Sequence, residues 1–454
     1  MTMADSSDPR LFNKPKRLIS LDAYRGFVML AMASSGLGFA RAVQKYPEIK
    51  TQLEGTSLDT AWHGMWDTLV YQFSHAPWTG CSFWDLIQPS FMFMVGVAMP
   101  FSKASRESLG HSPPKMFLHS VWRAAVLVLL AVFLSSNWGK QTNFTFTNVL
   151  AQIGLGYVFV YLLVGRGFVL QLLAAIAILG GSWYYFYQYE IPADEQAQLT
   201  QYLSEEKGQA KEKWTQFPDG MAAHWNQHTN AAAAFDRRFL NKFPRSEEPF
   251  EGQRFWANSG GYATLNFIPS MATMLFGLMA GTMLRGPGQP MHKCRNLLLA
   301  GLVCFVTAMA VDTTIWPVQF ESLNWSLCPV VKRIWSPTWA VFSTGWTLWM
   351  LAAFYWVIDI QGLKKWAFPL VVVGMNSIAI YCMAQLMKPW IGKIMEIHAN
   401  AMSILVGGYD GDFDLWRLLV ENNIYGPIWL SVLQVLVLWL ICLWLYRRKI
   451  FVRI

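Results

Sequence analysis

The chain has 454 residues, of which 54% are hydrophobic and only 14% are charged. Charged residues make up about a quarter of a typical soluble domain, so the composition excludes an ordinary soluble protein and indicates a polytopic membrane protein. The net charge of +8 is explained below by membrane orientation and contact with anionic membrane lipid. We therefore expect no nucleic-acid partner.

Apolar runs of about 20 residues, which suffice to cross a bilayer as a helix, recur along the chain. They lie at 19–40, 84–101, 117–135, 147–165, 167–187, 263–284, 296–315, 337–358, 367–387 and 425–446. The predicted fold is all-α, a polytopic membrane helix bundle of about ten transmembrane helices. The first run has basic residues before it and no small-residue cleavage site after it, so we interpret it as a retained helix.

Every second predicted loop is basic. The residues are Lys103, Arg106 and Lys115, then Arg166, then Arg285, Lys293 and Arg295, then Lys364 and Lys365, then Arg447, Arg448, Lys449 and Arg453. Because cytoplasmic loops carry the excess of Lys and Arg, both termini are predicted to be cytoplasmic. Lys332 and Arg333 are the exception on the outer side, where they serve either as a substrate clamp or as lipid-headgroup anchors.

Three regions follow from this pattern: residues 1–187 with helices one to five, residues 188–262, and residues 263–454 with helices six to ten. The middle region is rich in acidic residues and breaks the membrane pattern, which predicts an extracytoplasmic helical insert. His224 and His228 are spaced i,i+4 and would share a helical face. They lack a third metal ligand, so His228 and Asn230 either contact a hydrophilic substrate or lie on a solvated surface. We predict no metal site.

The six cysteines form no CxxC or Cys/His metal spacing. Cys81 and Cys328 both fall on the predicted outer side, where a disulfide is permitted. Sequence alone does not supply the geometry that such a bond requires.

His75 and Asp85 stand at the mouth of an apolar run, and ionisable groups beside such runs are functional-site candidates. His75 either acts as a general base or acyl acceptor or only anchors its loop. Asp85 either completes a capping box with Ser82 or orients His75, as the acid of a catalytic triad does. Trp78 suits the membrane interface, and we predict that it contacts the substrate.

Other polar residues stand at predicted helix ends. Asp22 and Arg25, at i,i+3, form either a structural ion pair or a site for the phosphates of a cytosolic ligand. Asn266, Ser270 and Asn376 either line a substrate path or hold helices together.

Two sequence runs resemble a known family. Arg17 to Gly26 has the pattern R-x-x-S-L-D-x-x-R-G, and His75 to Gly96 reads H-A-P-W-T-G-C-S-F-W-D-L-I-Q-P-S-F-M-F-M-V-G. Both resemble the heparan-alpha-glucosaminide N-acetyltransferase family of transmembrane acyltransferases. Later runs match in order at 148–157, 266–281, 332–339 and 374–377.

The resemblance implies a bacterial-type member in an inner (plasma) membrane that moves an acetyl group from cytosolic acetyl-CoA to an amino or hydroxyl group of an extracytoplasmic sugar or glycan. It implies no permanently bound cofactor, and it allows a homodimer. His75 takes the place of the residue that carries or activates the acetyl group, with Asp85 as its partner. Arg25 and Asp22 would meet CoA. The animal enzymes carry an Asn near the outer end of the first motif helix, where Ser34, Ser35 and Gly36 stand here.

Two other functions are compatible with the same residues. In a proton-coupled transporter or permease, His75 and Asp85 would form a gate and the protein would not bind CoA. In a membrane scaffold that has lost activity, neither CoA binding nor uptake is expected.

Overall fold

The computed structural model describes residues 18–44, 59–316, 325–407, 414–421, 423 and 425–452. Throughout these ranges the regular elements are helices, and strand pairing is limited to isolated bridges. The helices are α1 (Ile19–Ser34), α2 (Phe39–Gln44), α4 (Asp59–Gln72), α5 (Ile87–Ser108), α6 (Pro113–Ser135), α7 (Val149–Leu162), α8 (Phe168–Tyr187), α9 (Ala193–Gln201), α10 (Ala231–Leu240), α11 (Phe267–Arg285), α12 (Pro290–Val311), α13 (Pro337–Phe354), α14 (Phe368–Gly374), α15 (Ser377–Gly407) and α16 (Gly426–Arg447). The all-α prediction is confirmed.

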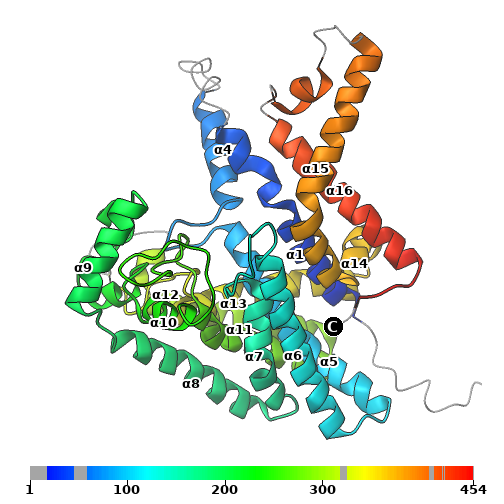
Figure 1. Ribbon diagram of the computed structural model, residues 1–454. Helices are drawn as coiled ribbons and strands as arrows, with labels where there is room; N and C mark the ends of the chain where they lie inside the picture. The colour runs from blue at the N-terminus through cyan, green and yellow to red at the C-terminus, as the bar shows by residue number, and fades with distance from the viewer. Residues whose placement is uncertain are drawn as a thin grey trace, which may run out of the picture.

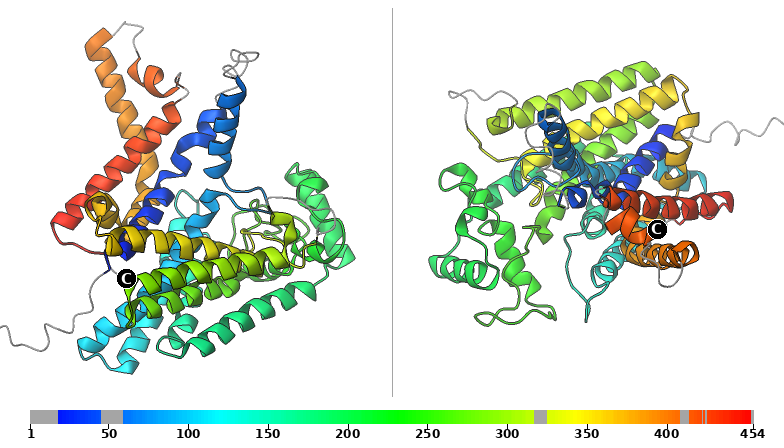
Figure 2. Two further views of the ribbon diagram at one scale, coloured as in Figure 1. Left: turned by 180° about the vertical axis from the view of Figure 1, so that it is seen from behind. Right: turned by 90° about the horizontal axis from the view of Figure 1, so that it is seen from above.

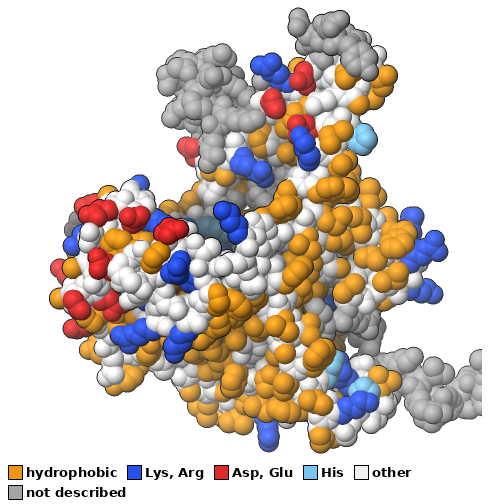
Figure 3. Space-filling view, in the orientation of Figure 1, with side chains coloured by type: hydrophobic (Ala, Val, Ile, Leu, Met, Phe, Trp, Pro, Cys, Tyr) orange, Lys and Arg blue, Asp and Glu red, His pale blue; other side chains and the backbone are white. Residues whose placement is uncertain are grey.

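The helices form a body with projecting arms. Helices α5 to α8 and α11 to α13 make up the body, while α4 and much of α15 and α16 extend beyond it (Figures 1 and 2). Hydrophobic side chains spread over the visible face of the body, whereas Asp and Glu gather on the insert and near the tips of the arms (Figure 3). This distribution fits a body that contacts lipid.

Six helical stretches among the described residues are long and apolar enough to cross a membrane: Pro113–Ser135, Phe168–Tyr187, Thr264–Arg285, Pro290–Val311, Pro337–Ile360 and Gly426–Arg447. The pair Lys365–Gly374 and Ser377–Val406, bent by 69°, makes a seventh if it is one span. Each of the ten predicted runs contains a helix, but ten spans are not confirmed. Helix α1 has 16 residues, α7 has 14, and the last turns of α5 are charged.

Helix α5 packs closely against α11 because glycines remove the side chains between them. A Cβ atom at Gly277 would lie 2.1 Å from the carbonyl oxygen of Phe93, and one at Gly96 would lie 1.9 Å from that of Met274. Small residues allow such backbone approach in membrane helices. Helix α5 also joins α1, where the hydroxyl of Tyr24 donates to Ser90 Oγ at 3.0 Å. These contacts fix the helix that begins just after Asp85.

The insert consists of short helices and turns around α9 and α10. His224 lies in a 3₁₀ turn, Met221–Trp225, whereas His228 lies in the turn before α10. The prediction that both share one helical face is therefore wrong, because Asn230 caps α10 through Ala233 N and starts a new helix. No group of three potential metal ligands occurs in the described ranges.

We predict that Gly277→Ala destabilises the protein, because the new methyl group would overlap the α5 backbone. Overpacking of this kind costs about 1–3 kcal/mol, which thermal unfolding of the purified protein in detergent would detect. Gly180→Ala in α8 is the matched control, since a Cβ atom at Gly180 would meet no neighbouring part of the described chain within 4 Å. Equal midpoints for the two variants would contradict the close contact.

Candidate functional site

Asp85 is both a helix cap and the partner of His75. Its Oδ2 accepts from Ser82 N at 3.1 Å, and Ser82 Oγ accepts from Asp85 N at 3.3 Å, which together form a capping box. Its Oδ1 lies 2.8 Å from His75 Nδ1, and Ala76 N donates to Oδ2 at 3.0 Å. The two alternatives offered by the sequence are thus both realised by one carboxylate that is 1% exposed.

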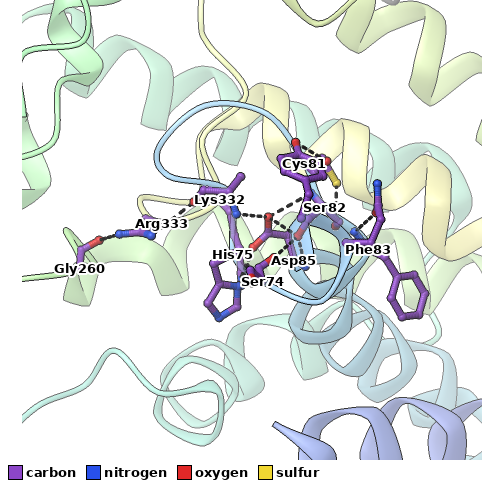
Figure 4. A network of polar contacts seen from close by, with 12 residues as sticks. Ser74, His75, Cys81, Ser82, Phe83, Asp85, Gly260, Lys332 and Arg333 are labelled. Atoms are coloured by element: carbon purple, nitrogen blue, oxygen red, sulfur yellow. Dashed lines mark hydrogen bonds and ion pairs between the residues drawn. The ribbon is translucent and has the colours of Figure 1, made fainter. Parts of the chain in front are cut away.

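A distant segment brings a third charged group to this pair. Thr79 pairs with Val331 in an isolated bridge, and Gly80 N donates to Val330 O at 3.0 Å. These bonds place Lys332 beside the His75 loop, so that its Nζ lies 3.1 Å from Asp85 Oδ1 and 3.0 Å from His75 Nδ1. Figure 4 shows His75 and Lys332 converging on Asp85. Of the two roles considered for Lys332, the structure therefore supports the site rather than lipid headgroups.

The three atoms constrain the protonation of the imidazole. His75 Nδ1 and Lys332 Nζ both face Asp85 Oδ1, and a carboxylate only accepts hydrogen bonds. The arrangement that satisfies the carboxylate has Nδ1–H and the ammonium both donating to it. In the neutral imidazole, a proton on Nδ1 leaves the lone pair on His75 Nε2. With that lone pair the imidazole can act as a base or nucleophile. The side chain is 41% exposed, so a substrate can reach it.

The surroundings keep Asp85 ionised. Burial alone would raise its pKa, but the His75 hydrogen bond, the Lys332 ammonium and two backbone N–H groups hold the pKa of Asp85 well below its usual range. Burial lowers the pKa of Lys332, and the adjacent carboxylate opposes that effect. At neutral pH the carboxylate is therefore an anion that orients the imidazole and stabilises positive charge on it.

His75 and Lys332 line a cavity of about 480 Å³. Its other lining residues come from several helices and loops: Met32, Ser35, Trp84, Ile87, Gln88, Thr147, Asn148, Val149, Tyr262, Tyr381 and Gln385. The volume falls within the range of small-molecule sites. Sequence reasoning missed Tyr262, Tyr381 and Gln385 as site residues, because nothing in the sequence indicates which side chains point into a common space.

A second cavity, of about 600 Å³, carries positive charge. It is lined by Asp22, Arg25, Phe91, Val95, Ala98, Ser102, Ser105, Arg106, Leu109, His111, Arg123, Gly374, Met375, Ser377, Ile378 and Val452. Asp22 and Arg25 approach to 3.8 Å, as their spacing predicted. Arg106 and Arg123 join them, although the sequence had indicated Arg106 only as a loop charge and had not singled out Arg123.

The two cavities are lined by residues of the same helices. Trp84, Ile87 and Gln88 of the η2 turn (Phe83–Leu86) and α5 line the His75 cavity, and the basic cavity begins at Phe91 on the same helix. Helix α15 repeats the pattern, with Ile378 at the basic cavity and Tyr381 at the other. Three residues of helix rise about 4.5 Å, so about one turn separates the two linings.

Three predicted substrate contacts lie elsewhere. Trp78 is 3% exposed, and its Nε1 donates to Trp225 O at 3.0 Å, which ties the His75 loop to the insert. Asn266 Nδ2 donates to Arg333 O at 2.7 Å, and Ser270 Oγ donates to Phe267 O at 3.0 Å. None of these side chains lines the His75 cavity. Each instead donates a hydrogen bond to a backbone oxygen.

The remaining predicted contacts are dispersed. Asn376 holds the C-terminal segment, because its amide bonds Ile450 O at 3.2 Å and Val452 N at 2.9 Å, near the basic cavity. Asn230 caps α10. His228 is 1% exposed and lines a separate cavity in the insert.

The disulfide considered between Cys81 and Cys328 is not formed, because both residues are free thiols.

These features define an integral membrane protein of helices in which an exposed His75 meets the buried side chains of Asp85 and Lys332. No family model matches the chain. It is 22% identical to the human heparan-alpha-glucosaminide N-acetyltransferase over an alignment of 497 residues, covering 98% of this chain and 61% of that protein. It is 22% identical to the mouse heparan-alpha-glucosaminide N-acetyltransferase over 412 residues, covering 85% of this chain and 57% of that protein. The chain thus spans about three fifths of the length of these relatives, to which its similarity is broad but weak.

We predict that Asp85→Asn lowers stability at neutral pH and flattens its acid dependence. The pKa of Asp85 is depressed in the folded protein, so its stabilising effect is present above the unfolded value of about 3.9 and is lost as pH falls below it. Removing the charge leaves the Lys332 ammonium buried without its counter-ion, which costs about 3 kcal/mol or more.

The measurement is the thermal midpoint of the detergent-solubilised protein between pH 7 and pH 3. Asp219→Asn is the control, because Asp219 is exposed on the insert. Parallel pH curves for wild type and Asp85→Asn would show that Asp85 does not carry this linkage.

Proposed function

We propose that this protein is a membrane acyltransferase that moves an acetyl group from acetyl-CoA to an amino or hydroxyl group of a sugar or glycan. CoA occupies the basic cavity beside Arg25, and the acceptor occupies the His75 cavity. The similarity to two N-acetyltransferases supports this reaction. In this proposal the basic end faces the cytoplasm of a bacterial cell, and both termini lie on that side of its inner membrane.

The observation that carries the proposal is the placement of the two cavities along α5. The nearest lining residues of the two cavities, Gln88 and Phe91, are about one helical turn apart, and the basic cavity extends from there along α5 to Arg106. Arg25 and Arg123 also line the basic cavity, whereas His75 and Lys332 line the other. Guanidinium groups suit the phosphates of CoA, because their fork of donors matches phosphate oxygens. The charged nucleotide can therefore stay at one end while only the small acetyl group reaches His75.

His75 serves acetyl transfer through the lone pair on Nε2. In a covalent route, Nε2 attacks the thioester carbonyl, the C–S bond breaks, and the CoA thiolate leaves and takes up a proton. The acceptor then attacks the acetyl carbon, the bond to Nε2 breaks, and the acceptor loses its proton. In a direct route, Nε2 removes the acceptor proton while the acceptor attacks the thioester, the C–S bond breaks, and the CoA thiolate leaves and takes up that proton. Asp85 stabilises the imidazolium in both routes.

The His75 cavity supplies polar groups for an acceptor. Tyr262, Gln88, Gln385 and Ser35 line it together with Lys332. Lys388 Nζ donates to Ser35 Oγ at 2.8 Å. The Lys388 ammonium therefore contacts the segment where the animal enzymes have an Asn. The amides of Gln88 and Gln385 supply in this cavity the kind of group that Ser35 does not.

We predict that His75→Ala lowers acetyl transfer at least about 100-fold, the usual contribution of a general base or nucleophile. The measurement is CoA release by purified protein supplied with labelled acetyl-CoA and a panel of amino sugars. His398→Ala, at an exposed position in α15, should retain wild-type activity. Label retained on acid-quenched wild-type protein but not on His75→Ala would select the covalent route. Wild-type turnover no faster than His75→Ala would refute the proposal.

We also predict that Arg123→Gln weakens CoA binding about tenfold, since a hydrogen bond to a charged group contributes about 1.5–3 kcal/mol. Arg123 lines the basic cavity and lies 4.8 Å from the centre of the Tyr157 ring. Calorimetric titration with CoA would measure the change. Lys115→Gln removes the same charge from an exposed position at the start of α6, outside the cavity, and should bind CoA as wild type does.

A proton-coupled transporter is the second candidate, because paired cavities about one turn apart and buried charges are also features of transport paths. It requires uptake that depends on a proton gradient and no CoA binding. The titration with CoA therefore separates the two functions in one measurement.

A further inference from the structure

An apolar cavity of about 440 Å³ lies between α8, α10 and the start of α11. Its lining includes Gly181, Tyr185 and Phe186 of α8, Phe235 of α10, Ile268 of α11, and Ile334. Apart from Gly181 and Ser182, every lining residue is hydrophobic. Among the described residues, this cavity shares no lining residue with the His75 cavity or the basic cavity. The proposed acyl transfer therefore does not use it.

The cavity lies on the lipid-facing side of α8. This helix is long and apolar enough to cross a membrane, and only 17% of its apolar stretch is buried inside the protein. Gly181 and Tyr185, one turn apart, are exposed, whereas the adjacent Ser182 and Phe186 are buried. The cavity is thus bounded by exposed residues on one side and by buried residues on the other, as expected of a groove that opens to lipid.

The absence of a side chain at Gly181 leaves the space open. A Cβ atom at Gly181 would meet no neighbouring part of the described chain within 4 Å. The Ser182 hydroxyl donates to Ile178 O at 2.8 Å, so it needs no partner in the cavity. Ordered water requires polar partners, and an unfilled cavity deprives its lining of packing contacts. A hydrocarbon chain would supply those contacts.

Arg238 lies near the end of the cavity where α8 leads into the insert. Phe235 lines the cavity, and Arg238 follows it by three residues on the same face of α10. Burial and Glu195 raise the pKa of the Tyr189 phenol, just past the end of α8, whereas the nearby Arg237 and Arg238 lower it. Arg237 pairs with Glu195. Arg238 is exposed and makes no ion pair within the described part of the chain, so its charge is available to an anion.

The same end of α8 has the composition of a membrane interface. Trp183, Tyr184, Tyr185 and Tyr187 lie in its last turns, and such aromatic residues gather at the level of lipid headgroups. Lys and Arg side chains lie along the border between the insert and the hydrophobic face (Figure 3). The headgroup of a lipid whose chain occupied the cavity would therefore lie at the level of Arg238.

We propose that this cavity binds one acyl chain of an anionic phospholipid, from the leaflet on the insert side of the membrane, with the headgroup phosphate paired with Arg238. A guanidinium matches phosphate oxygens. The headgroup of a zwitterionic phospholipid would bring a second cation beside Arg238, so the anionic lipid binds more tightly. The inference does not rest on the proposed acyl transfer.

A lipid bound in this cavity contacts the core that holds the candidate site. Ile334 lines the cavity and is two residues from Lys332. Ile334 and Phe186 belong to one buried cluster, which also contains Trp78 of the His75 loop. The acyl chain thus packs against residues that hold both segments of the site, and its binding stabilises the folded protein.

The experiment is native mass spectrometry of the full-length protein in detergent, titrated with dioleoyl phosphatidylglycerol, dioleoyl phosphatidylcholine or an isoprenoid phosphate. We expect one phosphatidylglycerol to bind at least about tenfold tighter than either other lipid. Gly181→Leu fills the cavity and should weaken this binding about tenfold or more. Arg238→Gln should lower the affinity for phosphatidylglycerol to that for phosphatidylcholine. Phosphatidylglycerol should also raise the thermal midpoint of wild type but not that of Gly181→Leu.

Gly180→Leu is the matched control, because a Cβ atom at Gly180 also meets no part of the described chain within 4 Å, but Gly180 does not line the cavity. Lys211→Gln removes a charge from an exposed position of the insert outside the cavity. Both variants should bind lipid as wild type does. Arg238 is exposed, so its substitution tests the headgroup contact even if Gly181→Leu does not fold.

Three results would overturn the inference. They are equal affinities of wild type for phosphatidylglycerol and phosphatidylcholine, wild-type affinity in Gly181→Leu, and equal losses in Gly181→Leu and Gly180→Leu. Tighter binding of the isoprenoid phosphate, or a dimer that Gly181→Leu disrupts, would also overturn it and would assign the cavity to that occupant instead.

Discussion

The candidate site depends on one buried carboxylate. Asp85 completes the capping box of the η2 turn that leads into α5, accepts from the His75 loop and faces the Lys332 ammonium. A buried anion is stable only when it is paired and fully hydrogen-bonded, so these three segments must hold their positions together. The 2.8 Å contact with the carboxylate favours a proton on His75 Nδ1. The atoms that satisfy helix capping, a local requirement, are therefore the same atoms that orient His75, which is a property of the whole site.

Helix α5 contributes residues to both cavities, to the His75 cavity at its start and to the basic cavity further along. Its close contact with α11 leaves little freedom to shift, because backbone atoms meet across Gly96 and Gly277. One helix thus sets the separation between the basic cavity and His75. The insert adds polar space next to the His75 cavity, at the end where Trp78 holds Trp225. In the proposed reaction, donor, imidazole and acceptor would accordingly follow one another along one direction of the protein.

The sequence predicted the helices and the pairing of His75 with Asp85. It did not predict which other side chains line the cavity beside them. His75 and Asp85 are ten residues apart, and their pairing follows from local signals: a capping box and an apolar run. Asn266, Ser270 and Asn376 were chosen as polar residues at helix ends, and they bond to backbone oxygens behind the cavities instead. Polarity shows that a side chain needs a partner. It does not show whether that partner is a ligand or a neighbouring helix.

The sequence by itself determined the all-α membrane class, because long apolar runs leave a helix as the way to satisfy the backbone in lipid. It also determined the Asp85 cap, which depends on residues within one turn. Only the tertiary structure decided that Lys332, 257 residues from His75, completes the site. It likewise decided that Arg106 and Arg123 share a cavity with Arg25. Contacts between distant segments depend on how helices cross and pack, and no local pattern encodes that geometry.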